Sequence, residues 1–133
     1  MSNIKKEMKE AADYAIKAGR ERFGQELDFS EQSIDKLDNL LEQAYQSFFN
    51  LPKNKKTSKA LTLTANIWGS YLGEFMRLKW GGTWIHNGSE RFVLIKRNRF
   101  SPIKFVYQKI SSHPEYSVRY YLFRAERILK WWF

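Results

Sequence analysis

Few side chains in this sequence could perform acid–base or nucleophilic chemistry. Cysteine is absent, which excludes thiol nucleophiles, disulfides and cysteine-ligated zinc. The two histidines, His86 beside a predicted turn and His113 before a proline, occupy positions typical of surface residues. No HExxH, Walker, GxGxxG or GxSxG motif occurs in the sequence. We therefore expect no metal site and no cofactor, and the residues favour a protein that is not an enzyme.

One cluster keeps a catalytic interpretation open. Gly69 and Gly73 lie four residues apart, so on a helix they would share a face that another element could approach closely. Glu74 would either form an ion pair within its helix or act as a carboxylate in a pocket. Trp80 and Trp84 flank a Gly-Gly pair and could line that pocket or fill the angle between a helix and a sheet. We predict the structural role for all five residues.

Charge is distributed unevenly along the chain. Residues 1–50 contain seven Lys/Arg and ten Asp/Glu, whereas residues 51–133 contain sixteen and four, so the net charge of +9 comes from the second part. A surface of one sign attracts partners of the opposite sign. We expect one continuous basic surface, with the partner-binding residues Arg91, Lys96, Arg97, Arg99, Lys104, Lys109, Arg119, Arg124, Arg127 and Lys130.

Such a surface suits an acidic protein or a phosphate backbone. We expect an acidic protein first, because small domains that lack catalytic groups often act as adaptors, inhibitors or immunity proteins. Nucleic acid is the alternative, because Phe92, Phe100, Phe105 and Tyr107 are interleaved with the cations and could stack on bases. Aromatic residues of this kind equally suit the core of a sheet. The basic, aromatic end of the chain, residues 124–133, suits docking on the sheet better than an anionic membrane, and an exposed end would favour a homodimer.

The elements that would position these residues follow from composition and periodicity. With 133 residues, 43% of them hydrophobic, the chain suits a single domain, residues 1–133, with a substantial core. The charged N-terminal segment lacks the apolar run of a signal peptide, and no stretch reaches the roughly 18 apolar residues of a membrane span. We expect a cytoplasmic location.

Three helices are predicted in the first 80 residues. Apolar residues recur at helical spacing over residues 4–23, and again over residues 34–48 after candidate N-caps at Asp28 and Ser30. Residues 57–80 carry a strand-like pattern at their start and a helical pattern later. We choose a helix for this segment because of its length and the Gly-Gly stop that follows it.

A β-meander is predicted over residues 83–110. An Asn-Gly pair between two alternating runs indicates a hairpin with a type I′ turn, and a third strand follows at residues 103–110. Beyond it, an apolar stripe that includes Ile128 predicts an amphipathic helix over residues 116–132. The predicted fold class is α+β, with N-terminal helices packed on a three-stranded antiparallel sheet and a C-terminal amphipathic helix completing the core.

Three segments resemble a pattern shared by a group of short bacterial proteins of unknown function. They are LDFSEQSIDKLD at residues 27–38, GSYLGE at 69–74 and GGTW at 81–84, which fit LDfSxxSlxxLD, GxYLGE and GGxW. The resemblance covers roughly residues 10–110 and leaves the basic C-terminal end outside it. It implies a bacterial, cytoplasmic α+β domain, and it brings no activity, cofactor or site residue with it.

Overall fold

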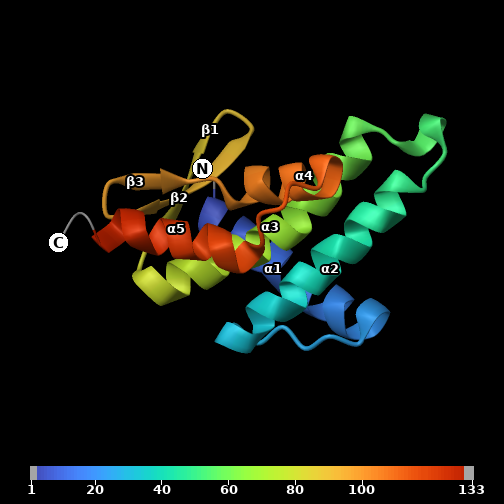
Figure 1. Ribbon diagram of the computed structural model, residues 1–133. Coiled ribbons are helices and arrows are strands. Elements are labelled where there is room, and N and C mark those ends of the chain that lie inside the picture. The colour runs from blue at the N-terminus through green and yellow to red at the C-terminus, as the bar shows by residue number, and fades with distance from the viewer. Residues whose placement is uncertain (1–2, 131–133) are drawn as a thin grey trace.

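Helix α3, Ser58–Trp80, runs through the middle of the molecule, between α1, Ile4–Phe23, and α4, Pro102–Ser112 (Figure 1). Helix α2, Glu31–Phe49, packs against α4 and against the last helix, α5, Val118–Lys130. The structure is a computed structural model and describes residues 3–130. Five α-helices and a three-stranded antiparallel sheet within this range confirm the predicted α+β class.

The three helices predicted in the first 80 residues are present, and local side chains define their starts. The Ser30 hydroxyl accepts a hydrogen bond from the Ser33 amide at the start of α2, and the Thr57 hydroxyl does the same for α3. In the ambiguous segment that opens α3, Leu61 is buried whereas Leu63 is 56% exposed. Residues two apart lie on the same face of a strand, so the different burial of these two leucines indicates a helix. A short 3₁₀ helix, Lys53–Lys55, connects α2 to α3.

The sheet is a meander of β1, Thr83–Asn87, β2, Glu90–Ile95, and β3, Asn98–Phe100. The predicted hairpin is confirmed, but its predicted turn type is wrong. Asn87 pairs with Glu90, so the two central turn residues are Gly88 and Ser89, and of these only Gly88 has a positive φ, 63°. A type I′ turn requires positive φ at both central positions.

The predicted third strand at residues 103–110 is wrong, because these residues belong to α4. Pro102 occupies the first turn of the helix, where its missing N–H costs no hydrogen bond. Val106 and Ile110, four residues apart, are buried together on one side of the helix. The actual third strand is three residues long and ends at Phe100, so the meander stops ten residues earlier than predicted.

The predicted C-terminal helix is present from Val118 to Lys130, and its predicted last residues, 131 and 132, lie outside the described part of the chain. Leu122, Ala125 and Leu129 are buried, as the apolar stripe predicts. Ile128 belongs to the same predicted stripe but is 41% exposed. Helix α5 therefore has one buried side, with Val118, Leu122, Ala125 and Leu129, and leaves Ile128 at the border of that side.

Buried apolar side chains from all five helices and all three strands form one cluster. Its largest fully buried members include Tyr71 and Met76 of α3, Ile34 of α2 and Ile95 of β2. A single shared core of this kind is what the predicted single domain requires. None of the helices within residues 3–130 is long and apolar enough to cross a membrane.

Candidate functional site

Glu74, the carboxylate that sequence reasoning singled out, is 4% exposed and both of its oxygens have partners. Arg77 donates to it twice, from Nε to Oε2 at 2.7 Å and from Nη2 to Oε1 at 3.2 Å. The Trp84 indole donates from Nε1 to Oε2 at 2.9 Å. Hydrogen bonding to the carboxylate raises the pKa of Arg77. The structure thus contains the ion pair within α3, one of the two arrangements that the sequence allowed.

The two glycines on α3 make room for neighbouring elements. A Cβ atom at Gly73 would lie 2.2 Å from the Trp84 ring, and one at Gly69 would lie 2.6 Å from the Cα atom of Ile103. These distances are far below any real contact of a Cβ atom. Gly73 therefore allows the Trp84 indole to lie flat enough against α3 to reach Glu74, and Gly69 allows α4 to approach α3.

Trp80 does not share a pocket with this pair. It lines a separate hollow near the end of α3 with Lys79 and Arg119, and the Lys79 ammonium lies 5.8 Å from its ring centroid. The three residues of the possible pocket, Glu74, Trp80 and Trp84, are therefore divided between a buried hydrogen-bonded pair and the half-buried Trp80.

The segment that resembles LDfSxxS is fixed to α3 through Tyr71. The Phe29 amide donates to the Tyr71 hydroxyl at 2.8 Å, and that hydroxyl donates to Ser33 Oγ at 2.8 Å. The Phe29 ring stacks on the Tyr71 ring with 4.7 Å between centroids. Burial raises the pKa of Tyr71, so the hydroxyl stays protonated and can donate. In this chain, all three segments of the pattern therefore meet at α3 through Tyr71 and Glu74.

The two histidines lie on different parts of the surface. His86 is exposed on β1. His113 ends α4, contacts Glu42 of α2 through Nε2, and stacks on Tyr45 with 4.0 Å between ring centroids. The hydrogen bond to His113 lowers the pKa of Glu42. No group of three or more His, Asp or Glu side chains within residues 3–130 is placed to hold a metal ion.

Arg91, Lys109 and Arg119, three of the predicted partner-binding cations, have polar partners on other parts of the described chain. Arg119 makes two hydrogen bonds to Asp35 of α2, at 3.0 and 2.9 Å. Arg91 contacts Glu7 of α1 at 3.4 Å. Lys109 is buried and donates to the carbonyl oxygen of residue 114 at 3.0 Å. Acidic residues of the first two helices or a backbone carbonyl therefore bind Arg91, Lys109 and Arg119 inside the chain, and their contact with a partner stays a prediction.

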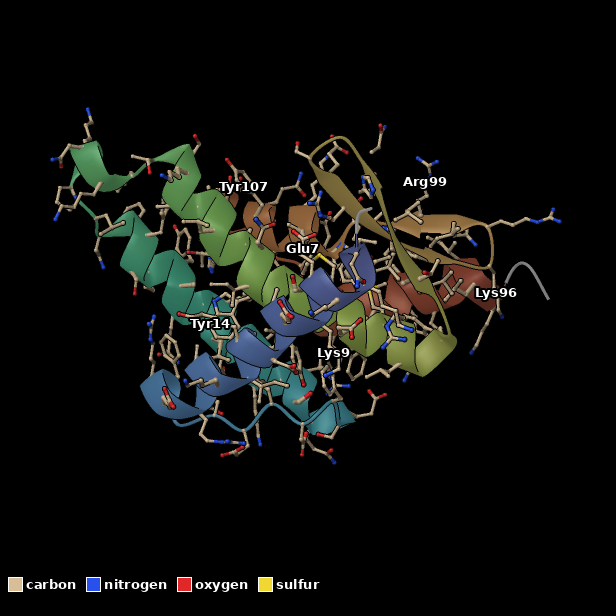
Figure 2. The ribbon with its side chains drawn as sticks, turned by 180° about the vertical axis from the view of Figure 1, so that it is seen from behind. Glu7, Lys9, Tyr14, Lys96, Arg99 and Tyr107 are labelled. Carbon is tan, nitrogen blue, oxygen red and sulfur yellow. The ribbon has the colours of Figure 1, made fainter. Side chains whose placement is uncertain are left out.

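The other seven predicted cations lie toward the sheet end of the molecule. Lys96 and Arg99 extend from the hairpin between β2 and β3, close to where α5 ends (Figure 2). Arg97 occupies the turn of the same hairpin, and Lys104 lies in the first turn of α4. A further three, Arg124, Arg127 and Lys130, are exposed on α5.

The outward side of α5 combines these cations with exposed apolar groups. Tyr116, Tyr120, Phe123 and Ile128 are between 41% and 55% exposed. We call the following seven residues the α5 surface: Tyr116, Tyr120, Phe123, Arg124, Arg127, Ile128 and Lys130. The Arg127 guanidinium lies 5.9 Å from the Phe123 ring centroid. Across residues 3–130, no carboxylate lies within 4 Å of the charged group of Arg124, Arg127 or Lys130.

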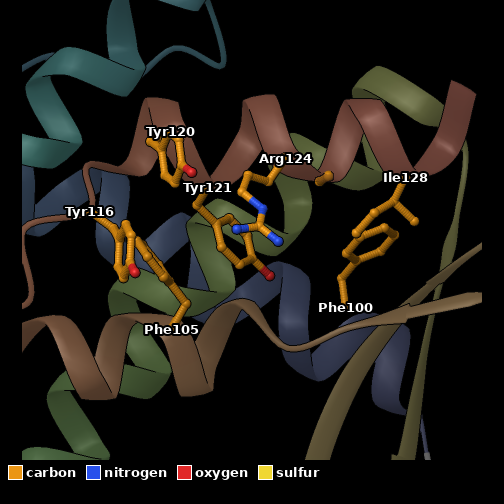
Figure 3. Close-up of a pocket in the computed structure, with 8 residues that line it drawn as sticks. Phe100, Phe105, Tyr116, Tyr120, Tyr121, Arg124 and Ile128 are labelled. Atoms are coloured by element: carbon orange, nitrogen blue, oxygen red, sulfur yellow. The ribbon is translucent and has the colours of Figure 1, made fainter.

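A pocket of about 320 Å³ opens between α4 and α5, next to β3 (Figure 3). We call it the α4–α5 pocket. The side chains that line it are mostly aromatic or aliphatic: Phe100, Phe105, Tyr116, Tyr120, Tyr121, Ala125 and Ile128, with Arg124 as the charged member. Figure 3 shows the Arg124 side chain extending from α5 into the gap between Tyr121 and Phe100. The pocket thus offers an apolar interior with one cation in it.

Two aromatic pairs form the wall of this pocket. Phe105 of α4 stacks on Tyr121 of α5 with 4.3 Å between ring centroids, and Tyr116 stacks on Tyr120 at 5.4 Å. Burial raises the pKa of Tyr121 far above its ordinary value, although a hydrogen bond from the Ser101 backbone opposes the shift. Tyr121 is therefore neutral, and Arg124 supplies the charge of the pocket.

Sequence reasoning found Arg124, Arg127 and Lys130 but not the exposed apolar residues beside them. The signal was present, because Tyr116, Tyr120 and Phe123 recur at helical spacing on the side away from the predicted apolar stripe. A second set of exposed cations lies at the tip between α2 and α3. We call these four residues the tip lysines: Lys53, Lys55, Lys56 and Lys59.

Comparison with protein-family models, curated proteins and solved structures finds no match for this chain. The α5 surface is therefore interpreted from its own geometry.

Proposed function

We propose that this chain is a non-enzymatic binding module that engages an acidic protein through the α5 surface. The observation that carries the proposal is a set of three cations on α5 that have no carboxylate within 4 Å among residues 3–130. They lie beside four large apolar side chains that are at least 41% exposed. Exposed apolar side chains gathered beside a pocket are typical of interaction sites. Tyr, Phe and Arg are also the residue types enriched in protein interfaces.

Charge complementarity supports an acidic partner. The carboxylates of the first two helices bind Arg91, Arg119 and Lys79, whereas the cations of the α5 surface have no such neighbour among the described residues. A partner that supplied carboxylates here would replace water around Arg124, Arg127 and Lys130, and opposite charges would also accelerate its association.

Affinity capture with the full chain tests this proposal. The chain is used as bait in a nuclease-treated extract of its source cells, and retained proteins are identified and quantified against the bait. We expect a stoichiometric acidic protein that elutes as the salt concentration rises. Recovery of RNA alone before nuclease treatment, with no stoichiometric protein afterwards, would contradict the proposal.

Nucleic acid is the second candidate, because the exposed Tyr116–Tyr120 stack lies beside Arg124 and could combine base stacking with phosphate contacts. The two candidates differ in their salt dependence. Binding of random single-stranded DNA that falls steeply and linearly in a plot of log affinity against log salt would favour nucleic acid. Absence of DNA binding at low salt would remove this candidate.

A homodimer through α5 is disfavoured by the same charges. A two-fold interface would bring Arg124, Arg127 and Lys130 of one copy close to those of the other without carboxylates between them. Sedimentation is expected to give a monomer at low salt.

The proposal also includes the expected cytoplasmic location, and the position of a fluorescent fusion in intact cells tests it.

A further inference from the structure

The α4–α5 pocket has the size of a single side chain. Ligand pockets usually span about 300 to 1,000 Å³, so a volume of about 320 Å³ is at the lower end of that range. Such a space admits one aromatic ring with a short substituent. It is too small to enclose a large cofactor.

The lining of the pocket restricts the chemistry of its occupant. Phe105 and Tyr121 form a stacked floor, and Phe100 and Ile128 close one end (Figure 3). An apolar ring gains from leaving water on such surfaces and can pack face or edge against the aromatic wall. A nucleobase fits less well, because the polar atoms on its edge would be buried against mostly apolar side chains.

Arg124 adds a requirement for negative charge. Its guanidinium extends into the pocket, and no carboxylate of the described chain pairs with it (Figure 3). A carboxylate next to the ring of the occupant could accept two hydrogen bonds from this guanidinium. A cationic occupant would be repelled by Arg124, and then by Arg127 on the next turn of the helix.

We propose that the α4–α5 pocket receives an aromatic side chain of the acidic partner, with a neighbouring carboxylate of that partner paired to Arg124. This inference rests on the proposed function and names the contact that would anchor the partner. Anchors of this type commonly carry a large share of the binding energy of an interface. The surrounding Arg127 and Lys130 would then contact the more solvated acidic groups at the edge of the interface.

The probe for this inference is indole-3-propionate, an aromatic ring with one carboxylate, titrated into the ¹⁵N-labelled full chain and followed by NMR. We expect shifts centred on Tyr121, Ala125 and the Arg124 Nε–H signal, with millimolar affinity. Tryptamine carries the same ring with a positive charge and is the matched control. It is expected to give no shifts at these positions.

Two variants test whether the carboxylate of the probe contacts Arg124. Arg124→Gln is expected to weaken indole-3-propionate binding by about tenfold, the effect of losing one charge-assisted hydrogen bond. Lys55→Gln removes a positive charge from the tip lysines, outside the pocket lining and the α5 surface, and is expected to leave the affinity within about twofold. The NMR spectrum of each free variant shows whether it is folded.

Several results would overturn the inference: equal binding of tryptamine, equal weakening by both variants, shifts centred elsewhere, or preferential binding of uridine monophosphate. The last result would favour nucleic acid. If indole-3-propionate fails to bind while the wild-type chain still captures an acidic protein, the inference fails and the proposed function stands. If the probe binds in the pocket and no acidic protein is captured, the proposed function fails and the inference fails with it.

Discussion

At the scale of single residues, the polar side chains in the interior are there to connect elements. Glu74 joins Arg77 of its own helix to Trp84 of β1, and Tyr71 joins Phe29 to Ser33 across the start of α2. Each of these buried groups has a hydrogen-bonding partner, which is the condition for burying polar atoms without a large cost. Tyr71 and Glu74 therefore both have a structural role in connecting elements.

Replacing Glu74 tests this interpretation directly. Glu74→Ala leaves the Trp84 indole N–H and the Arg77 guanidinium without their acceptor, and we expect the free energy of unfolding to fall by about 3 kcal/mol. Urea denaturation measures the change. The matched control is Glu90→Ala, at an exposed strand position, which is expected to cost about 0.5 kcal/mol or less. Similar losses for both variants would contradict the role of Glu74 as an internal connector.

At the scale of elements, α3 organises the fold because its glycines allow close contacts. Gly73→Ala would gain about 1 kcal/mol of helix propensity. The added methyl group would collide with the Trp84 ring, which Glu74 holds in place, and overpacking of this kind costs about 1–3 kcal/mol or more. We expect the collision to win, with a net loss of about 2 kcal/mol in the free energy of unfolding.

A double-mutant cycle isolates this contact. Trp84→Phe removes the ring atoms nearest to Gly73, so the penalty of Gly73→Ala should be clearly smaller in the Trp84→Phe background. Urea denaturation of all four proteins gives the coupling energy. An equal penalty in both backgrounds would show that Gly73 is needed for another reason.

The attachment of α5 to α2 depends on pH through Asp35. Hydrogen bonds from Arg119 lower the pKa of Asp35 in the folded chain, so the folded state binds this proton less readily than the unfolded state. The stabilisation is fully present above the unfolded pKa, about 4, and is lost as the pH falls through the lower folded value. Burial raises the pKa of the neighbouring Asp38, whose contribution has the opposite sign, and Glu31 also faces Arg119.

We therefore expect Asp35→Asn to lower the free energy of unfolding at pH 7 and to have a smaller effect below pH 4. Urea denaturation of both proteins across this range measures the difference. In an Arg119→Gln background, the pH dependence of the difference should largely disappear. A difference that stays constant from pH 7 to the lowest pH would contradict the assignment of this ion pair.

The sequence predicts an element well when the residues that determine it are close together in the chain. Helix caps such as Ser30 and Thr57 act within three residues, and the predicted helices are confirmed there. Residues 103–110 alternate like a strand because Ile103, Phe105 and Tyr107 are half-buried against other elements, while Val106 and Ile110 face the core. That distinction depends on which surfaces surround α4, and a single-sequence pattern does not contain it.

At the scale of the whole molecule, the basic residues of the second part of the chain fall into two groups, those bound inside the chain and those that face outward. The first group forms ion pairs within the chain, in which acidic residues of α1 and α2 bind Arg91, Arg119, Lys79 and His113. The sequence predicted a basic half but could not reveal which cations these carboxylates would bind, since the pairs are 48 to 88 residues apart. What remains outward is concentrated on α5, on the adjacent hairpin and at the tip between α2 and α3.

We propose that the α5 surface, and not the total charge, recruits an acidic protein. The most direct test compares two triple variants with the same charge change in quantitative capture of that protein. One carries Arg124→Glu, Arg127→Glu and Lys130→Glu on the α5 surface, and the other carries Lys53→Glu, Lys55→Glu and Lys59→Glu among the tip lysines. We predict that the first variant loses the partner and the second retains it. Equal loss in both variants, or loss only in the second, would contradict the account.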